Sequence, residues 1–433
     1  MKKDSIVEAD PPMIFNLFPR HFPFIDDWSG ILPHAKEMGF NWIYVNPFHT
    51  RGYSGSLYAI KNYYQIDSLF LKKNQDPADW RIVKSFVASC TKSGCSVMMD
   101  LVINHTAFDS VLVASNPLWY KWDERGKPLC PRAIDPANAE NVTIWGDLAE
   151  IDNEGSSDRK GLWNYWDKLV AFYQDKGILG FRCDAAYQVP AELWKFLISS
   201  AKNRRPRTVF LAETLGCRLE EIDRLKGTGF DYLYNSSKYW EFDQPWCIEQ
   251  HARNKRIAPS ISFPESHDTT RLAADEPGTE NVQKSRYVFS ALFSKGLLMP
   301  MGYEYGAKTR MDVVRGAVRD VDSPQWDLTA WIATVNKLKL SVPVLCEEGT
   351  WNVPFPYDRD LLFLEKRSEK GAESVFLCIN KNKRSSRGVS LDEFPQEVRH
   401  CKKIVRPFVE DAQAAKLPDG LELAPAEIVV LLQ

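Results

Sequence analysis

Charged side chains end an apolar, strand-like segment in the middle of the chain, at residues 178–184. Arg182 and Asp184 lie here with one residue between them. Because side chains alternate between the two faces of a strand, these two point the same way, and the arginine favours the ionised form of the carboxylate. The pair is therefore a candidate active-site floor. The alternative is a surface salt bridge at a strand end, which this segment alone does not exclude.

Three further segments favour the active-site interpretation, because each is apolar and ends in carboxylates or imidazoles. In chain order they carry Asp100 and His105 at residues 97–105, Glu213 at residues 208–214, and His267 and Asp268 at residues 260–268. Two carboxyl groups can act together as a nucleophile and a proton donor. Their pKa values must differ, so Asp184 beside Arg182 suits the nucleophile and Glu213 on an apolar strand suits the acid/base.

Length, charge and cysteine usage limit the class of protein. With 433 residues, the chain can form one large domain and one small domain. Its formal net charge of −2 gives no electrostatic reason to expect a nucleic-acid partner or an anionic membrane surface. No apolar stretch reaches the length of a membrane span, and the N-terminus lacks the apolar core of a signal peptide. Nine cysteines without CxxC spacing are typical of reduced thiols, so we expect a cytoplasmic protein.

Strand-like and helical segments alternate along most of the chain. Strands are predicted at residues 13–18, 40–48, 96–103, 178–184, 208–213, 230–235, 260–266 and 297–306. Helices are predicted at residues 28–38, from residues 76–77 onward, and at 163–176, 190–202, 281–294 and 327–341. This order predicts an α/β fold, a (β/α)8 TIM barrel, whose sites lie at the C-terminal ends of the strands. A doubly wound open sheet is the alternative, but no GxGxxG follows the first strand.

Two regions depart from this alternation. Residues 105–161 are polar, proline-containing and too long for an ordinary loop, which predicts a small inserted subdomain B after the third strand. The catalytic barrel would then comprise residues 1–104 and 162–345. Residues 346–433 hold strand-like segments separated by polar turns, at 361–367, 374–380 and 427–433. They predict a C-terminal antiparallel, β-sandwich-like domain that serves packing rather than chemistry.

The four charged segments, in this order and spacing, resemble the four short motifs of the α-amylase superfamily, glycoside hydrolase family 13. The resemblance also implies Asp184 as nucleophile and Glu213 as acid/base, with Asp268 as a third carboxylate that binds sugar hydroxyls. The segments IFNLFPR and YVFSALFSKGLLMPMGYEYG look like the maltosyltransferase branch of this family. The implied function is cleavage of α-1,4-glucosidic bonds in an α-glucan or maltooligosaccharide. Transfer of the sugar to another sugar, and non-catalytic carbohydrate binding on the same scaffold, are the alternatives.

The same resemblance implies a set of substrate-binding residues. His105 and His267 match the histidines that hydrogen-bond the first sugar, and Asp100 matches a residue that orients Arg182. Tyr58, within SGSLYAIKNYYQID, matches a tyrosine that stacks on the sugar. The sequence WGDL at residues 145–148 is similar to a motif in the inserted subdomain that shapes specificity, although a plain turn is the other interpretation.

One departure from the family pattern concerns calcium. Tyr187 and Gln188 stand where calcium-binding members commonly have Lys-His, and only Asn104 and Asp147 remain as candidate oxygen ligands. Because calcium takes roughly 6–8 oxygen ligands, we expect no cofactor and a weak or absent calcium site. The sequence gives no indication of the oligomeric state.

Overall fold

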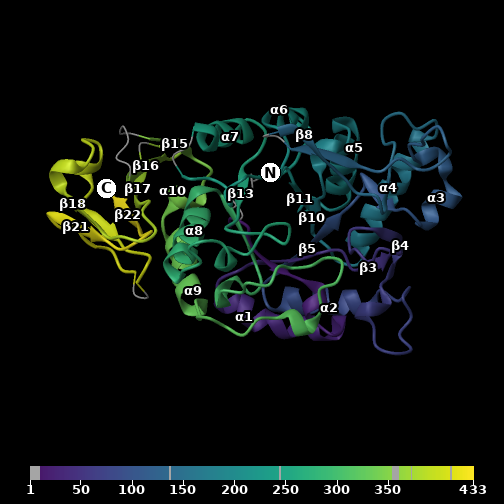
Figure 1. Ribbon diagram of the computed structural model, residues 1–433, viewed down its shortest axis with the longest axis horizontal. Helices are drawn as coiled ribbons and strands as arrows, with labels where there is room; N and C mark the ends of the chain where they lie inside the picture. The colour runs from purple at the N-terminus through teal and green to yellow at the C-terminus, as the bar shows by residue number, and fades with distance from the viewer. Residues whose placement is uncertain (1–9, 136–137, 243–244, 354–359, 372, 410–411) are drawn as a thin grey trace, which may run out of the picture.

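A closed parallel barrel forms the centre of the protein (Figure 1). The computed structural model describes residues 10–433 except 136–137, 243–244, 354–359, 372 and 410–411. The barrel strands close in the order β1-β14-β13-β12-β11-β10-β5-β2. They are β1 (Met13–Leu17), β2 (Trp42–Val45), β5 (Ser96–Leu101), β10 (Gly180–Cys183), β11 (Val209–Ala212), β12 (Tyr232–Tyr234), β13 (Ser260–Ser262) and β14 (Gly296–Pro300). The predicted (β/α)8 barrel is confirmed.

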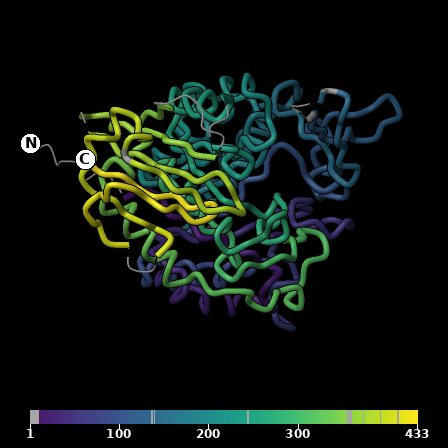
Figure 2. The backbone as a smooth tube through the Cα atoms, turned by 60° about the vertical axis from the view of Figure 1, so that its left-hand side comes forward, coloured from purple at the N-terminus to yellow at the C-terminus, as the bar shows by residue number. Residues whose placement is uncertain are grey.

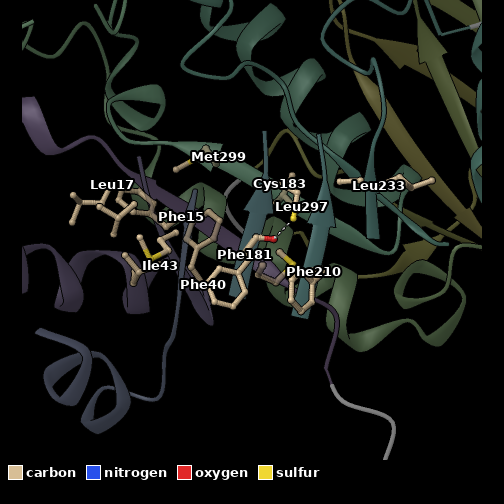
Figure 3. Packing of buried hydrophobic residues seen from close by; sticks show 14 of the residues in the cluster. Phe15, Leu17, Phe40, Ile43, Phe181, Cys183, Phe210, Leu233, Leu297 and Met299 are labelled. Carbon is tan, nitrogen blue, oxygen red and sulfur yellow. Dashed lines mark hydrogen bonds between the residues drawn. The ribbon is translucent and has the colours of Figure 1, made fainter. Parts of the chain in front are cut away.

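Helices surround the barrel and cover the outward faces of its strands (Figure 1). They include α1 (Leu32–Glu37), α2 (Arg81–Lys92), α4 (Arg159–Asp175), α5 (Ala191–Arg204), α6 (Leu219–Ile222), α7 (Pro245–Lys255), α8 (Glu280–Phe293) and α9 (Thr329–Ser341). Figure 3 shows outward strand side chains such as Phe15, Phe181 and Phe210 in this helix-covered core. No helix in the described part of the chain is both long and apolar enough to cross a membrane.

Side chains alternate between the helix-covered core and the barrel interior, as a pleated strand requires. On β1, Phe15 belongs to the outer core, whereas Ile14 belongs to a separate cluster inside the barrel. On β5, Met98 lies in the interior cluster, so Asp100, two residues later, shares its inward face. On β10, Phe181 faces the outer core, which leaves Arg182 on the inward face. Register pairs Arg182 with Asp100 across these neighbouring strands.

The predicted start of the second helix is wrong. Residues 76–79 form turns instead, in which Asp76 Oδ1 accepts from Ala78 N at 2.9 Å, and α2 begins only at Arg81. The carboxylate next to the helix is Asp79, whose Oδ1 accepts the Arg81 amide at 3.0 Å. Asp76 and Asp79 can each accept a hydrogen bond from a free backbone amide, so the sequence did not show which of them precedes the helix. Sequence patterns also missed α7 and the antiparallel pair of β3 (His49–Arg51) and β4 (Ile60–Ile66). These segments lack a regular spacing of apolar residues.

The segment between β5 and α4 contains two small antiparallel pairs rather than barrel units. β6 (His105–Ala107) pairs with β9 (Leu148–Glu150), and β7 (Arg132–Asp135) pairs with β8 (Asn138–Ile144). Between them lie α3 (Val111–Ser115) and a 3-10 turn. Because β6 follows β5 directly, the segment is rooted at the C-terminal end of the barrel.

After α10 (Pro343–Cys346) the chain forms an antiparallel sheet, as predicted for the C-terminal region (Figure 2). Its strands run in the order β15-β16-β17-β22-β19-β20. They are β15 (Thr350–Asn352), β16 (Leu361–Arg367), β17 (Ser374–Asn380), β22 (Ile428–Leu432), β19 (Lys403–Val405) and β20 (Ala415–Lys416), and a second pair joins β18 (Arg387–Ser390) to β21 (Gly420–Leu423). On β16, Leu362 and Leu364 belong to the same core as the barrel, whereas Leu361 and Phe363 pack into a separate outer core.

The C-terminal sheet also satisfies backbone groups of the barrel. The last carbonyls of a helix have no partner within that helix. At the end of α8, Phe293 O accepts from Lys366 Nζ at 2.8 Å and from Trp351 Nε1 at 3.1 Å. The Trp351 ring stacks on Phe293 at 4.6 Å between centroids. Lys366 is fully buried here, and burial lowers the pKa of its ammonium group well below the ordinary value.

We therefore expect Trp351→Ala to destabilise the whole chain rather than the C-terminal sheet alone. Loss of this 4% exposed indole should lower the free energy of unfolding by about 3–5 kcal/mol. Urea denaturation followed by far-UV circular dichroism measures the change. Trp122→Ala, at a 40% exposed indole, is the matched control and should cost less than about 1 kcal/mol. Equal effects of the two substitutions would contradict this account of the junction.

Candidate active site

One buried guanidinium organises the C-terminal end of the barrel. Arg182 is 1% exposed. Its Nη1 donates to Asp184 Oδ1 at 2.5 Å and to Asp100 Oδ1 at 2.8 Å. Its Nη2 donates to Asp268 Oδ2 at 3.5 Å and lies 3.9 Å from Glu213 Oε2. Four carboxylates from four different segments of sequence therefore surround a single cation.

Strand register and one strained residue place the carboxylates. Asp184 follows β10 directly and Glu213 follows β11, its neighbour in the barrel. Between them, Ala185 has a φ of 40°, in the left-handed region that non-glycine residues rarely occupy. This conformation directs the Ala185 amide to Glu213 Oε2 at 2.8 Å, while Leu215 N donates to Oε1 at 2.7 Å.

The carboxyl groups differ in their electrostatic surroundings. Burial, together with the nearby charge of Asp184, raises the pKa of Glu213 to about 8, against the opposing effect of Arg182. Burial would also raise the pKa of Asp268, but His267, Arg182 and Arg310 outweigh it and hold that pKa well below its ordinary value. At neutral pH the site therefore combines a protonated Glu213 with an ionised Asp268.

Tyr58 and His267 form a stacked pair above the arginine. Their ring centroids lie 5.5 Å apart with 5° between the planes. Tyr58 Oη lies 2.6 Å from His267 Nε2 and donates to Asp100 Oδ2 at 3.1 Å. His267 Nε2 also lies 3.1 Å from Asp268 Oδ2. These contacts join the segment after β2 to the loop after β13.

His105 lies at the start of β6 and is buried, with 6% exposure. Neither of its ring nitrogens forms a hydrogen bond within the described residues. Burial lowers the pKa of the imidazole, against the charge of Asp184, so at neutral pH the ring is uncharged. One nitrogen can then donate and the other accept, as a sugar hydroxyl requires. The structure thus brings all eight of the expected site residues to one end of the barrel.

Sequence reasoning missed two tyrosines of this site. Tyr44 Oη donates to Asp100 Oδ2 at 2.6 Å, and Tyr234 faces Arg182 with 5.9 Å between ring centroid and guanidinium. Tyr58 lies at the same distance from the guanidinium. Both missed residues sit on barrel strands at inward positions. Alternation along β2 and β12 was the available signal, but it does not distinguish a site tyrosine from a core tyrosine.

Asn104 is one of the two candidate calcium ligands, with Asp147. Asn104 Nδ2 donates to Gln188 Oε1 at 3.5 Å, while its Oδ1 is buried without a hydrogen bond. Across the described residues, no group of three His, Cys, Asp or Glu side chains converges as metal ligands do. Calcium takes roughly 6–8 oxygen ligands, so a weak or absent calcium site stays a prediction.

A cavity of about 350 Å³ lies at the C-terminal side of β10 and β11. It is bounded by the loops after β10 and β11 and by the β7–β8 segment, and its lining includes Lys121, Arg132, Tyr187, Gln188, Gly216 and Arg218. Burial raises the pKa of Tyr187, and the charge of Glu213 raises it further. Gly216 in the lining lies three residues after Glu213 in the chain.

Comparisons with known proteins agree with this fold. Residues 7–120 match the model of a family described as the glucanotransferase domain of glycogen debranching enzyme. The α-1,4-glucan:maltose-1-phosphate maltosyltransferase of Burkholderia pseudomallei is 28% identical over 60% of this chain and 23% of its own length. The corresponding protein of Chlorobaculum tepidum is 26% identical over 91% of this chain and 61% of its own length. The chain thus spans less than two thirds of these relatives.

Solved structures share the fold at low sequence identity. An α-amylase from Lactobacillus plantarum has a TM-score of 0.76 at 18% identity, covering 98% of this chain and 99% of that one. A maltogenic α-amylase from Thermotoga neapolitana has a TM-score of 0.73 at 20% identity, with the same coverage. The chain is thus similar in sequence to maltosyltransferases and similar in fold to α-amylases, which agrees with the resemblance to the α-amylase superfamily.

The raised pKa of Glu213 predicts a pH-dependent stability. In the fold this carboxyl stays protonated to about pH 8, whereas in the unfolded chain it ionises near 4.5. The stability that it contributes is complete below pH 4.5 and is lost as the pH rises to about 8. We expect calorimetry to show the melting temperature of Glu213→Gln rising relative to wild type across this interval.

The control for this experiment is Glu192→Gln, which changes a solvent-exposed glutamate of α5. Its melting temperature should follow the wild-type profile at a constant offset. Because the amide side chain introduced by Glu213→Gln must also face two backbone donors, only the change of the offset with pH is diagnostic. A constant offset for Glu213→Gln would contradict the assigned protonation.

Proposed function

We propose that this protein is a retaining α-glucan-active enzyme of glycoside hydrolase family 13. It would cleave α-1,4-glucosidic bonds of α-glucans or maltooligosaccharides through a covalent glycosyl-enzyme intermediate. The observation that carries the proposal is the contrast between two neighbouring carboxyl groups. Asp184 receives a 2.5 Å hydrogen bond from Arg182, whereas Glu213 has its pKa raised to about 8. A nucleophile and a proton donor need this difference at the same pH.

In the first step, Asp184 attacks the anomeric carbon while Glu213 gives its proton to the departing glycosidic oxygen. In the second step, Glu213 removes a proton from the incoming hydroxyl, which displaces Asp184 with a second inversion. Arg182 supports both roles. It stabilises the charge of Asp184, and its Nη2 lies 3.9 Å from Glu213 Oε2, beyond hydrogen-bond distance. Asp268, His267 and His105 would hold the hydroxyl groups of the sugar, and Asp100 would orient Arg182.

Transfer to a second sugar is the other candidate reaction. Hydrolysis and transfer share the intermediate and differ in whether water or a sugar hydroxyl attacks it. The names of the relatives, maltosyltransferases and a maltogenic α-amylase, support transfer and hydrolysis respectively. The cavity of about 350 Å³ lined by Tyr187 and Gly216 offers room for a sugar near the loops after β10 and β11. A non-catalytic carbohydrate-binding role is disfavoured, because all three carboxylates are present.

The reaction type can be determined from the products of maltohexaose, with and without added maltose or inorganic phosphate. Shorter chains alone would indicate hydrolysis, and a ladder of longer chains would indicate transfer. Chelation with EDTA should leave the rate unchanged, because Asn104 and Asp147 are too few oxygen ligands for a tight calcium site. Unchanged maltohexaose under every condition would overturn the enzymatic proposal in favour of the binding protein.

Substitution of the two carboxylates should separate their roles. Asp184→Asn should lose turnover of every α-glucoside by many orders of magnitude, because no covalent intermediate can form. Glu213→Gln should lose about 10²–10⁴-fold on maltooligosaccharides, the typical value of proton transfer. With α-glucosyl fluoride, whose leaving group needs no proton, its first step should survive.

Added azide provides the decisive readout for these variants. In Glu213→Gln it should attack the trapped intermediate and yield an α-glucosyl azide, since two inversions retain configuration. Rescue of Asp184→Asn by azide with a β product would also agree with Asp184 as the nucleophile, because azide then attacks the substrate directly and the product forms with one inversion instead of two. Near-normal activity of Asp184→Asn on natural maltooligosaccharides would overturn the assignment of the nucleophile.

We also infer a reducing, cytoplasmic setting for this activity. All nine cysteines lie within the described residues, and no disulfide joins any two of them there. Seven of these are buried, which is usual for structural thiols in a reducing compartment.

A further inference from the structure

Tyr58 belongs to the short loop that joins β3 to β4. Its ring stacks on His267, which comes from the loop after β13. Its hydroxyl group accepts from Asn46 Nδ2 at 3.1 Å, in addition to its contacts with His267 and Asp100. The position of the ring at the site therefore depends on what holds residues 52–58.

The loop itself provides weak local support for this tyrosine. Ser54 Oγ accepts from Ser56 N at 3.3 Å, and Ser56 Oγ accepts from Tyr58 N at 3.3 Å. Both bonds are long for an N–H donor. Gly55, between the two serines, has a φ of 81°, and glycine loses more conformational freedom on folding than any other residue. A contact from outside the loop is therefore needed to fix its position.

Arg20 provides this contact from the 3-10 turn that directly follows β1. Its Nη2 donates to Gly55 O at 2.5 Å. Its Nε donates to Val313 O at 3.1 Å and its Nη1 to Gly316 O at 3.3 Å, both in the segment after β14. Val313 O also accepts from Leu57 N at 3.0 Å. One guanidinium thus fastens the backbone just before the stacked tyrosine to a segment from the other end of the barrel sequence.

Arg20 is buried, with 7% exposure, although these three acceptors are uncharged carbonyls. Burial and the nearby charge of Arg51 lower the pKa of its guanidinium, against the charges of Asp67 and Asp312. A buried cation that donates to neutral acceptors is less stabilised than one in contact with carboxylates. An arginine nevertheless suits this position, because its planar fork presents several donors in fixed directions, which the flexible ammonium group of a lysine does not.

The segment after β14 is a firm anchor for this contact. Arg271, from the loop after β13, donates from Nη2 to Met301 O at 3.0 Å and from Nε to Thr309 O at 3.1 Å. Its Nη1 donates to Glu265 Oε1 at 2.7 Å, and both side chains of this pair are buried. The loop before β4 and the loop after β13 are thus each fastened by a buried arginine to the same segment, so the two stacked rings share one anchor.

We propose that Arg20 is a positioning residue for the reaction, which holds Tyr58 against His267 by fastening Gly55 to the segment after β14. The proposal rests on the proposed function, in which these two rings belong to the sugar site. It gives a role to the segment IFNLFPR, whose last residue is Arg20. The arginine acts through the tyrosine and does not itself contact the sugar. An arginine that only stabilised the fold would have no specific effect on this ring.

A double-mutant cycle measures whether Arg20 acts through Tyr58. Arg20→Lys keeps the charge and loses the fork, and should lower kcat/KM for maltohexaose about tenfold, because small misplacements of a positioned group slow a reaction strongly. In the Tyr58→Ala background the same substitution should change kcat/KM by less than about twofold, since the ring to be positioned is already absent. Arg20→Gln, which loses the charge, should behave in the same way. Equal losses in both backgrounds would overturn the proposal.

The matched control is Arg315→Lys, which makes the same chemical change at an exposed arginine between Val313 and Gly316. It should leave kcat/KM unchanged in both backgrounds. A general loss of stability in an Arg20 variant would lower the activity equally with and without the Tyr58 ring, so the cycle distinguishes it from positioning.

A second measurement follows the stacked pair without any need for activity. The chain has seven histidines, so isotope-labelled histidine rings give a small set of NMR signals, and His267→Gln assigns the signal of His267 by its loss. In Arg20→Lys and Arg20→Gln this signal should move toward its position in Tyr58→Ala, because the stack and the 2.6 Å contact between the two side chains are altered. In Arg315→Lys it should stay in place.

An unchanged His267 signal in both Arg20 variants would overturn the proposal. Failure of the proposed function would look different, because the wild-type protein would then leave maltohexaose intact. The NMR measurement would still determine in that case whether Arg20 holds Tyr58 against His267.

Discussion

The burial of one arginine among four carboxylates is the constraint on which the rest of this structure depends. Taking a charge out of water costs several kcal/mol unless it is paired and hydrogen-bonded. Arg182 meets this condition with Asp100 and Asp184 on Nη1 and Asp268 on Nη2, while Tyr58 and Tyr234 flank it with their rings. Its own burial would lower its pKa, but the surrounding anions hold that pKa well above the ordinary value.

The same cation allows neighbouring carboxyl groups to behave differently. Asp184 is in direct contact with the guanidinium, whereas Glu213 is 3.9 Å away, more deeply buried and close to the charge of Asp184. Contact therefore favours the anion at one position, and desolvation favours the acid at the other. Ala185 lies between the two strands and has a left-handed backbone conformation. Its amide donates to Glu213, so this strained residue helps to hold the buried carboxyl group in place.

The C-terminal sheet takes part in the barrel's stability without approaching this site. Lys366 and Trp351 donate to the last carbonyls of α8, which the helix itself cannot satisfy. Lys339, from α9, donates to the neighbouring Ser294 O at 2.7 Å. The two buried lysines thus come from different parts of the chain and meet at one helix end, so the sheet and the barrel form one folding unit.

The sequence by itself determined the class of fold and the charged residues of the candidate active site. Alternating apolar segments predicted eight barrel strands, and residues such as Asp184 and Glu213 were found because each ends an apolar run where local spacing is informative. Only the tertiary structure decided which inward tyrosines reach Arg182 and that Tyr58 stacks on His267. These contacts join segments far apart in the chain, and their geometry depends on barrel closure and register, which no local pattern encodes.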